Sequence, residues 1–131
     1  MDDTGQFDIA IIGAGIAGSA LATALSGNNL SIALVEAQAL DRPELPTALD
    51  LQHFDPRVSA LTPRSRLLLE NLDAWAAIAA YRQCAYRHMT VWDAEGTGCI
   101  EFDSADVNAP ALGHIVENRA IVSALLARVA A

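Results

Sequence analysis

The chain has 131 residues, of which 53% are hydrophobic and 18% charged, and its formal net charge is −8. This length suits one domain, and the composition excludes an intrinsically disordered chain. All 8 basic residues are arginines. A negative net charge without a basic run argues against nucleic acid or an anionic membrane surface as the partner, although one local site can still bind an anionic ligand.

Two cysteines, Cys84 and Cys99, are too few for a disulfide framework, and their spacing matches no zinc motif. We therefore expect two reduced, buried thiols. The beginning of the chain, MDDTGQFD, is acidic and polar, unlike a signal or transit peptide. No apolar stretch approaches the roughly 20 residues of a membrane helix. These features predict a cytoplasmic protein.

The first elements are predicted to run strand, helix, strand. Residues 7–12 (FDIAII) are apolar and β-branched, as in a parallel strand covered on both faces. Residues 16–25 predict a helix that ends at the Ser-Gly-Asn-Asn sequence of residues 26–29. Residues 30–35 predict a second buried strand, which ends at Glu36. This is the size of one βαβ unit.

The middle of the chain changes character. Residues 37–57 are rich in Pro and Asp and predict a long loop, a type of segment that is usually functional or mobile. Thr62 and Pro63 then read as the N-cap and first residue of a helix over 63–71. A second helical segment is predicted at 73–80.

The remaining residues predict a β-hairpin and a closing helix. Short strands at 89–92 and 99–102 flank a turn at 93–96, and a further short strand is predicted at 113–116. Apolar residues at four-residue spacing predict a helix over 118–129.

Together these elements predict an α/β fold: a Rossmann-like βαβ unit with an inserted β-hairpin, incomplete as it stands. A two-stranded parallel sheet has little stability of its own, and the residues after 129 offer no further strand. We therefore expect the N-terminal fragment of a larger protein. We also expect an uncovered sheet edge that could pair with a second copy, giving a homo-oligomer or a strand swap.

The glycine pattern Gly13, Gly15 and Gly18 carries the sharpest chemical signal. The first glycine permits the tight turn after the strand, the second lets the backbone approach a pyrophosphate, and the third lets the helix pack closely on the strand. Ile16 and Ala17 lie between them, where the helix directs free N–H groups and a partial positive charge at that pyrophosphate.

Glu36, at the end of the second strand, completes the dinucleotide pattern. A carboxylate there can accept hydrogen bonds from both ribose hydroxyls of an adenosine and would repel a 2′-phosphate. The combination favours NAD or FAD over NADP and does not separate the first two. The alternative is a glycine-rich turn in an α/β domain that binds nothing.

Arg57, in the segment DPRVSAL at 55–61, is the second candidate. One guanidinium beside a pyrophosphate supplies forked, charge-assisted hydrogen bonds that lysine cannot reproduce. The alternative is a surface arginine paired with Asp55, and the spacing does not decide between them.

Three segments in this order resemble the flavoprotein aromatic hydroxylases, and most of all the ubiquinone-biosynthesis hydroxylases. They are the glycine turn with Glu36, DPRVSALTPRSRLLLENLDAW at 55–75, and GHIVENRAIVSALL at 113–126. The resemblance spans residues 7–126. The D-x-R-x-x-A-L and I-V-E-N-R patterns are its most specific parts.

The resemblance implies a set of FAD contacts. The three glycines would hold the FAD pyrophosphate and Glu36 the adenosine ribose. Arg57 would lie along the phosphate–ribitol part, and Ala60 and Leu61 near the flavin. Asn118 or Arg119 would approach from the other side. No catalytic residue is implied within the chain.

It also implies an activity for the intact family. NADH or NADPH would reduce the FAD, and an aromatic or quinone-precursor substrate would be hydroxylated, with membrane association open for the full-length enzyme. The family's later Ala-Asp-Gly and Gly-Asp-Ala-x-His motifs are absent here. We therefore expect weak FAD binding or none, and no turnover, from these residues alone. Residues 85–112 would belong to the substrate-domain sheet.

Two other readings stay open: another FAD or NAD oxidoreductase, such as an amine oxidase or dehydrogenase, and a non-enzymatic interaction module. His53, His88 and His114 lack ligand-like spacing, so no metal site is predicted. Trp75 and Trp92 are expected in core or interdomain packing.

Overall fold

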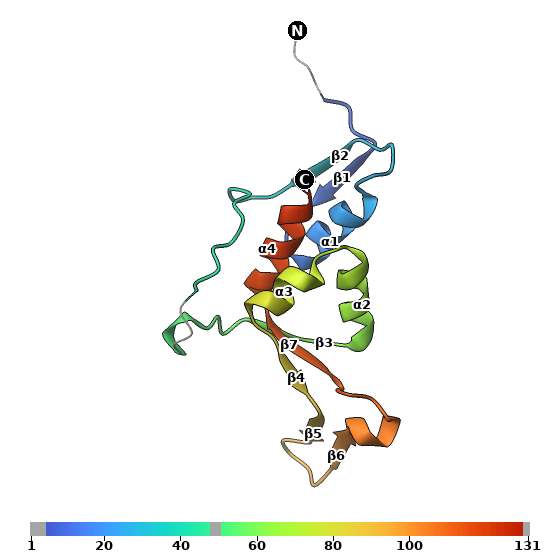
Figure 1. Ribbon diagram of the computed structural model, residues 1–131, viewed down its shortest axis with the longest axis vertical. Coiled ribbons are helices and arrows are strands. Elements are labelled where there is room, and N and C mark those ends of the chain that lie inside the picture. The colour runs from blue at the N-terminus through green and yellow to red at the C-terminus, as the bar shows by residue number, and fades with distance from the viewer. Residues whose placement is uncertain (1–4, 48–50, 130–131) are drawn as a thin grey trace.

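The computed structural model describes residues 5–47 and 51–129. Its elements in chain order are β1 (Ile9–Ile12), α1 (Ile16–Leu25), β2 (Ile32–Val35), the 3-10 turn η1 (Leu51–His53), β3 (Val58–Leu61), α2 (Pro63–Asn71), α3 (Trp75–Tyr81), β4 (Cys84–Tyr86), β5 (His88–Trp92), β6 (Cys99–Asp103), the 3-10 turn η2 (Ser104–Val107), β7 (Gly113–Glu117) and α4 (Asn118–Val129). The predicted α/β class is confirmed. The helices lie between a small sheet of β1 and β2 and a second sheet, beyond which a hairpin projects (Figure 1).

Strands β1 and β2 pair in parallel, with Ile9 opposite Ile32 and Ile12 opposite Val35. Helix α1 connects them, so the predicted βαβ unit is confirmed. This sheet contains two strands among the described residues. Ile12 is 80% and Val35 48% exposed, so the sheet keeps a large apolar surface uncovered.

The second sheet is antiparallel and has the order β3–β7–β4. The sequence predicts β7 but no strand at β3 or β4. Both are very short and owe their strand structure to β7, which pairs Val58 with Glu117 and Cys84 with Ile115. Since neither strand carries a long alternating pattern, local sequence could not reveal that pairing.

The core lies where α2, α3 and α4 meet β7. Its most buried members include Ile78, Val116, Ile121 and Leu125, each at most 1% exposed. Thr62 caps α2 as predicted, because its hydroxyl accepts a hydrogen bond from the N–H of Ser65. Helix α1 packs along α4, which ties the βαβ unit to the rest of the fold.

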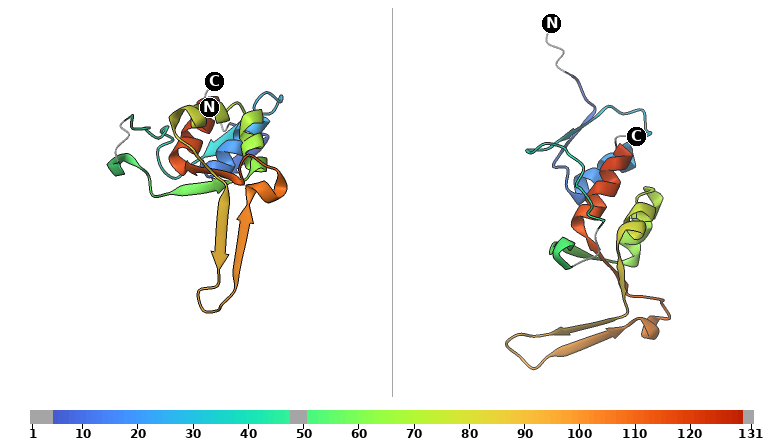
Figure 2. Two further views of the ribbon diagram at one scale, coloured as in Figure 1. Left: turned by 60° about the horizontal axis from the view of Figure 1, so that its bottom comes forward. Right: turned by 60° about the vertical axis from the view of Figure 1, so that its left-hand side comes forward.

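The hairpin β5–β6 extends away from the helices (Figure 2). Opposite pairs Met89–Phe102 and Val91–Ile100 share one face, and all four side chains are at least 40% exposed. An isolated two-stranded hairpin has marginal stability, so this face suits a further layer. Residues 85–86, at the start of the predicted substrate-domain segment, lie in β4 and pair with β7.

The prediction of buried cysteines is wrong, because Cys84 and Cys99 are both exposed. Each lies on a strand without a covering layer, and the sequence pattern could not show which strands are covered. Trp75 is 9% exposed and belongs to the core, as expected, whereas Trp92 on the hairpin is 70% exposed.

Candidate functional site

The glycine turn follows the end of β1 and leads directly into α1. Gly13 has a φ of +97°, which favours glycine because a side chain would be strained there. Its N–H donates to the carbonyl of Val35, 2.7 Å away, and so fixes the turn against the end of β2. Helix α1 begins at Ile16 with Gly15 as its N-cap, which offers no capping side chain to the first N–H groups.

Gly15 and Gly18 meet very different surroundings. A Cβ on Gly18 would lie 1.8 Å from the carbonyl oxygen of Gly13, so close packing of helix on turn requires glycine there. A Cβ on Gly15 would have nothing within 4 Å, so the space beside it is open. Open space next to uncapped N–H groups at a helix N-terminus fits a diphosphate.

The Glu36 carboxylate contacts the glycine turn. One oxygen accepts a hydrogen bond from the N–H of Ala14 at 2.7 Å, and the other accepts from the N–H of Ala37 at 2.7 Å. These hydrogen bonds, the one from Ala14 first, lower the pKa of Glu36, so the group is firmly anionic near neutral pH. A carboxylate at this position can accept hydrogen bonds from the hydroxyls of a neutral ribose that adjoins a diphosphate. It would repel an additional phosphate on that ribose.

The other predicted residues gather at the joint between β3, β7 and α4. The carbonyl of Arg57 accepts a hydrogen bond from the N–H of Asn118 at 2.9 Å. The Asn118 side chain in turn accepts from the hydroxyl of Ser59 at 2.6 Å. Ala60 is exposed, whereas Leu61 packs against the core. Arg57 and Asn118 thus come together, whereas Ala60 and Leu61 lie farther along β3, opposite Ile115 and His114.

The Arg57 side chain is 82% exposed, and its Nε lies 3.7 Å from a carboxylate oxygen of Asp55. Here the guanidinium therefore makes the surface pairing that the sequence left open. An exposed pair of this length contributes little to stability, so the guanidinium is free to take another anion.

The glycine turn and this joint border the same core, since Ile16 at the start of α1 and Leu61 at the end of β3 both pack against it. The two groups of predicted contacts are thus connected through one core.

A buried charge cluster was missed as a unit by the sequence analysis. The Glu117 side chain is 5% exposed and forms ion pairs with Arg82 at 3.0 Å and Arg119 at 2.6 Å. Arg119 thus pairs with Glu117 here. Burial acts to lower the pKa of Arg119, but the hydrogen bond and charge of Glu117, with smaller contributions from Tyr81 and Asp55, outweigh it and raise that pKa. The sequence E-N-R at 117–119 could have indicated the Glu117–Arg119 pair. Arg82 lies outside that segment, and no local pattern links it to Glu117.

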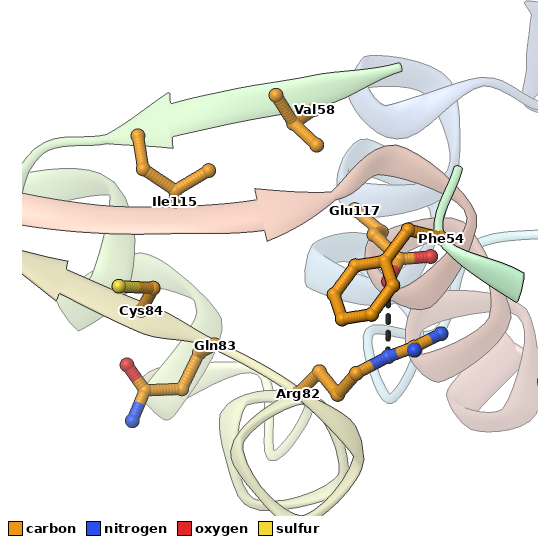
Figure 3. Close-up of a pocket in the computed structure, with 7 residues that line it drawn as sticks. All are labelled: Phe54, Val58, Arg82, Gln83, Cys84, Ile115 and Glu117. Carbon is orange, nitrogen blue, oxygen red and sulfur yellow. Dashed lines mark ion pairs between the residues drawn. The ribbon is translucent and has the colours of Figure 1, made fainter. Parts of the chain in front are cut away.

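A mostly apolar cavity of about 290 Å³ lies beside this cluster. Figure 3 shows Phe54 facing the Arg82–Glu117 ion pair, with side chains of β3, β4 and β7 along one wall. The residues that line it are Phe54, Val58, Arg82, Gln83, Cys84, Ile115 and Glu117.

Known proteins resemble this chain in sequence and in fold. A family described as an NAD(P)-binding Rossmann-like domain matches residues 11–40, which cover the glycine turn, α1, β2 and Glu36. The chain is 36% identical to the 3-demethoxyubiquinol 3-hydroxylase of Escherichia coli over 118 residues, which are 90% of this chain and 29% of that protein. The chain is a sequence relative of the ubiquinone-biosynthesis hydroxylases. The predicted resemblance is confirmed.

Further relatives of the same kind include the mitochondrial ubiquinone biosynthesis monooxygenases COQ6 of Xenopus tropicalis, 36% identical, and Homo sapiens, 34% identical. Each match covers 91% of this chain and 25% of the relative. The chain therefore spans between a quarter and a third of the length of the hydroxylases it matches, which agrees with the expected partial match to a longer monooxygenase.

Among solved structures, the fold is similar to that of P. aeruginosa PqsL, including its complex with 2-aminobenzoylacetate, with a TM-score of 0.66. That match covers 95% of this chain and 30% of the other at 17% identity, and it shows the fold alone.

Within residues 5–47 and 51–129, no group of three or more His, Cys, Asp or Glu side chains could hold a metal ion. No helix in that part of the chain is long and apolar enough to span a bilayer.

Proposed function

We propose that this chain supplies the FAD-binding part of a monooxygenase that hydroxylates an aromatic or quinone precursor, with NADH or NADPH as the electron donor. The observation that carries the proposal is the contact of the Glu36 carboxylate with the N–H of Ala14, beside the open space at Gly15. A sugar and a diphosphate need these two features next to each other. The sequence kinship with quinone-precursor hydroxylases supports FAD over NAD as the resident dinucleotide.

Each predicted residue takes a part in holding FAD. Gly13, Gly15 and Gly18, with the N–H groups of Ile16 and Ala17, would hold the diphosphate. Glu36 would hold the adenosine ribose. The joint beyond them would serve the flavin half, through Arg57, Ala60, Leu61 and Asn118.

When bound, FAD supplies the redox chemistry, and the protein supplies position and shielding from water. The relatives are about four times as long, so we do not expect these residues alone to enclose a reacting flavin. Turnover is therefore proposed for the longer protein. A cytoplasmic location likewise stays a prediction.

The proposal extends to the β5–β6 hairpin, which we assign to the substrate-domain sheet of the longer protein. Its exposed apolar face, with Met89 and Phe102 opposite each other, supports this assignment. Self-association through that face or through the β1–β2 edge is the competing possibility, and sedimentation of the isolated chain would reveal it.

Amide NMR spectra of the ¹⁵N-labelled chain test the cofactor assignment. Added FAD and added ADP should both shift the amide signals of residues 13–18, even if binding is weak, because both carry the ADP half. FMN, which lacks adenosine, should leave those signals in place. Unchanged signals at saturating FAD and ADP, or equal shifts with FMN, would overturn the proposal.

A further inference from the structure

The segment that leads into Arg57 is held in an unusual way. Residues 53–57 come at the end of the long loop after β2, and they join the sheet at β3. The Glu117 carboxylate accepts a hydrogen bond from the N–H of Asp55 at 3.2 Å. The carbonyl of His53 accepts hydrogen bonds from Nη2 of Arg82, at 3.1 Å, and from Nη2 of Arg119. Two separate main-chain groups of this short segment thus bind one buried cluster.

The same segment is fixed by its own side chains. The guanidinium of Arg82 lies over the ring of Phe54, 4.2 Å from its centroid, in a cation–π contact that is visible in Figure 3. The Asp55 carboxylate accepts from the N–H of Arg57 at 2.9 Å. The contacts therefore continue from the cluster to the main chain of Arg57.

The buried charges balance. Arg82 and Arg119 contribute two positive charges, and Glu117 and Asp55 two negative ones, while their side chains are 12%, 20%, 5% and 12% exposed. A balanced cluster gives no electrostatic reason for an anionic ligand to enter the adjoining cavity. A buried ion pair is weak evidence for a gain in stability. The effect of these charges on the geometry of residues 53–57 is therefore more informative than their effect on stability.

We propose that Glu117, through Arg82 and Arg119, is a positioning residue: it clamps residues 53–57 to the sheet so that Arg57 and Asn118 meet the same ligand. Asn118 follows Glu117 directly, and its N–H donates to the carbonyl of Arg57. One carboxylate therefore sets the main chain on both sides of the joint. The ligand's identity as FAD rests on the proposed function, whereas the clamp itself does not.

Hydrogen exchange without any ligand tests the clamp. Arg119→Lys keeps the charge, but one ammonium cannot reach the Glu117 carboxylate and the His53 carbonyl in the forked geometry of arginine. We expect the amides of residues 53–55, 57 and 58 to exchange about tenfold faster in this variant. Arg128→Lys is the matched control, because Arg128 lies on the same helix and pairs with exposed Asp73. Equal exchange in Arg119→Lys and the control would overturn the clamp.

Arg82→Lys gives an independent version of this test, since it also removes the stack on Phe54. If Arg119→Lys unfolds without cooperativity, and so is not properly folded, hydrogen exchange in Arg82→Lys tests the clamp in its place. Exchange that quickens throughout the chain rather than in residues 53–58 would mean a general loss of stability, and it would also count against a positioning role.

FAD affinity then tests whether the clamp acts through Arg57. Arg119→Lys should raise the FAD dissociation constant about tenfold, and should add little once Arg57→Ala is present, because the two changes share one effect. Fully additive losses would overturn action through Arg57. If the parent chain binds no FAD, the proposed function fails, while the exchange result still decides the clamp.

Discussion

The carboxylate of Glu36 accepts a hydrogen bond from the main-chain N–H of Ala14, with the two atoms 2.7 Å apart. This contact joins the end of β2 to the turn after β1. It places an anionic group on the glycine turn, where in the proposed function a ribose would adjoin a diphosphate.

A substitution at Gly15 should separate ligand binding from folding. Gly15→Ser adds a hydroxyl that can cap α1, so we expect the free energy of unfolding to rise by a few tenths of a kcal/mol. The same side chain fills the open space and occupies the free N–H groups, so FAD- and ADP-induced amide shifts should vanish. Urea unfolding and NMR titration measure the two effects.

Gly18→Ala is the contrasting change. Its Cβ would lie 1.8 Å from the Gly13 carbonyl oxygen, so the helix must move away from the turn. We expect a loss of about 2 kcal/mol in the free energy of unfolding. An unchanged urea midpoint for Gly18→Ala, or a large loss for Gly15→Ser, would contradict this account of the turn.

The amide signal of Ala14 should report the ionisation of Glu36. Its hydrogen bonds lower the pKa of Glu36 below the ordinary value of 4.5, so the contact persists above that value and is lost as the pH falls through the lowered pKa. A pH titration followed by NMR should show this step, and Glu36→Gln should remove it. Glu95→Gln, on the exposed hairpin turn, should leave the step in place.

Leu125 should be the most costly leucine to truncate. It is 0% exposed within the core. Leu125→Ala should lower the free energy of unfolding by about 3 kcal/mol, because it leaves a cavity. Leu67→Ala, at a position 47% exposed on α2, should have a small effect in the same chemical unfolding measurement. Similar losses for both would mean that the helices are not packed as described.

His114 should make the protein less stable in mild acid. Burial, assisted by the charge of Arg66, lowers the pKa of His114 below 6.5. The His114 ring packs edge-on against the Trp75 ring, with the two ring centroids 5.2 Å apart. The unfolded chain therefore takes up a proton more readily, so stability is full above pH 6.5 and falls as the pH drops toward the lowered pKa. Urea midpoints at several pH values measure this loss.

His114→Gln should flatten that pH dependence relative to the parent chain. His88→Gln is the surface control, since His88 lies exposed on the hairpin in contact with Asp103. An equally steep loss in His114→Gln and the parent would show that another group is responsible.

The sequence by itself determined most of the local elements and the glycine turn. The glycines at 13, 15 and 18 and the acid at 36 stand at fixed spacings that steric and electrostatic requirements explain. The cap at Thr62 depends on a residue only three positions away. The tertiary structure alone decided the rest. Strands β3 and β4 exist because β7 pairs with them, the cysteines lie on uncovered strands, and Glu117 meets Arg82 across 35 positions of chain. Those contacts depend on long-range packing, for which a periodic pattern in the sequence carries no signal.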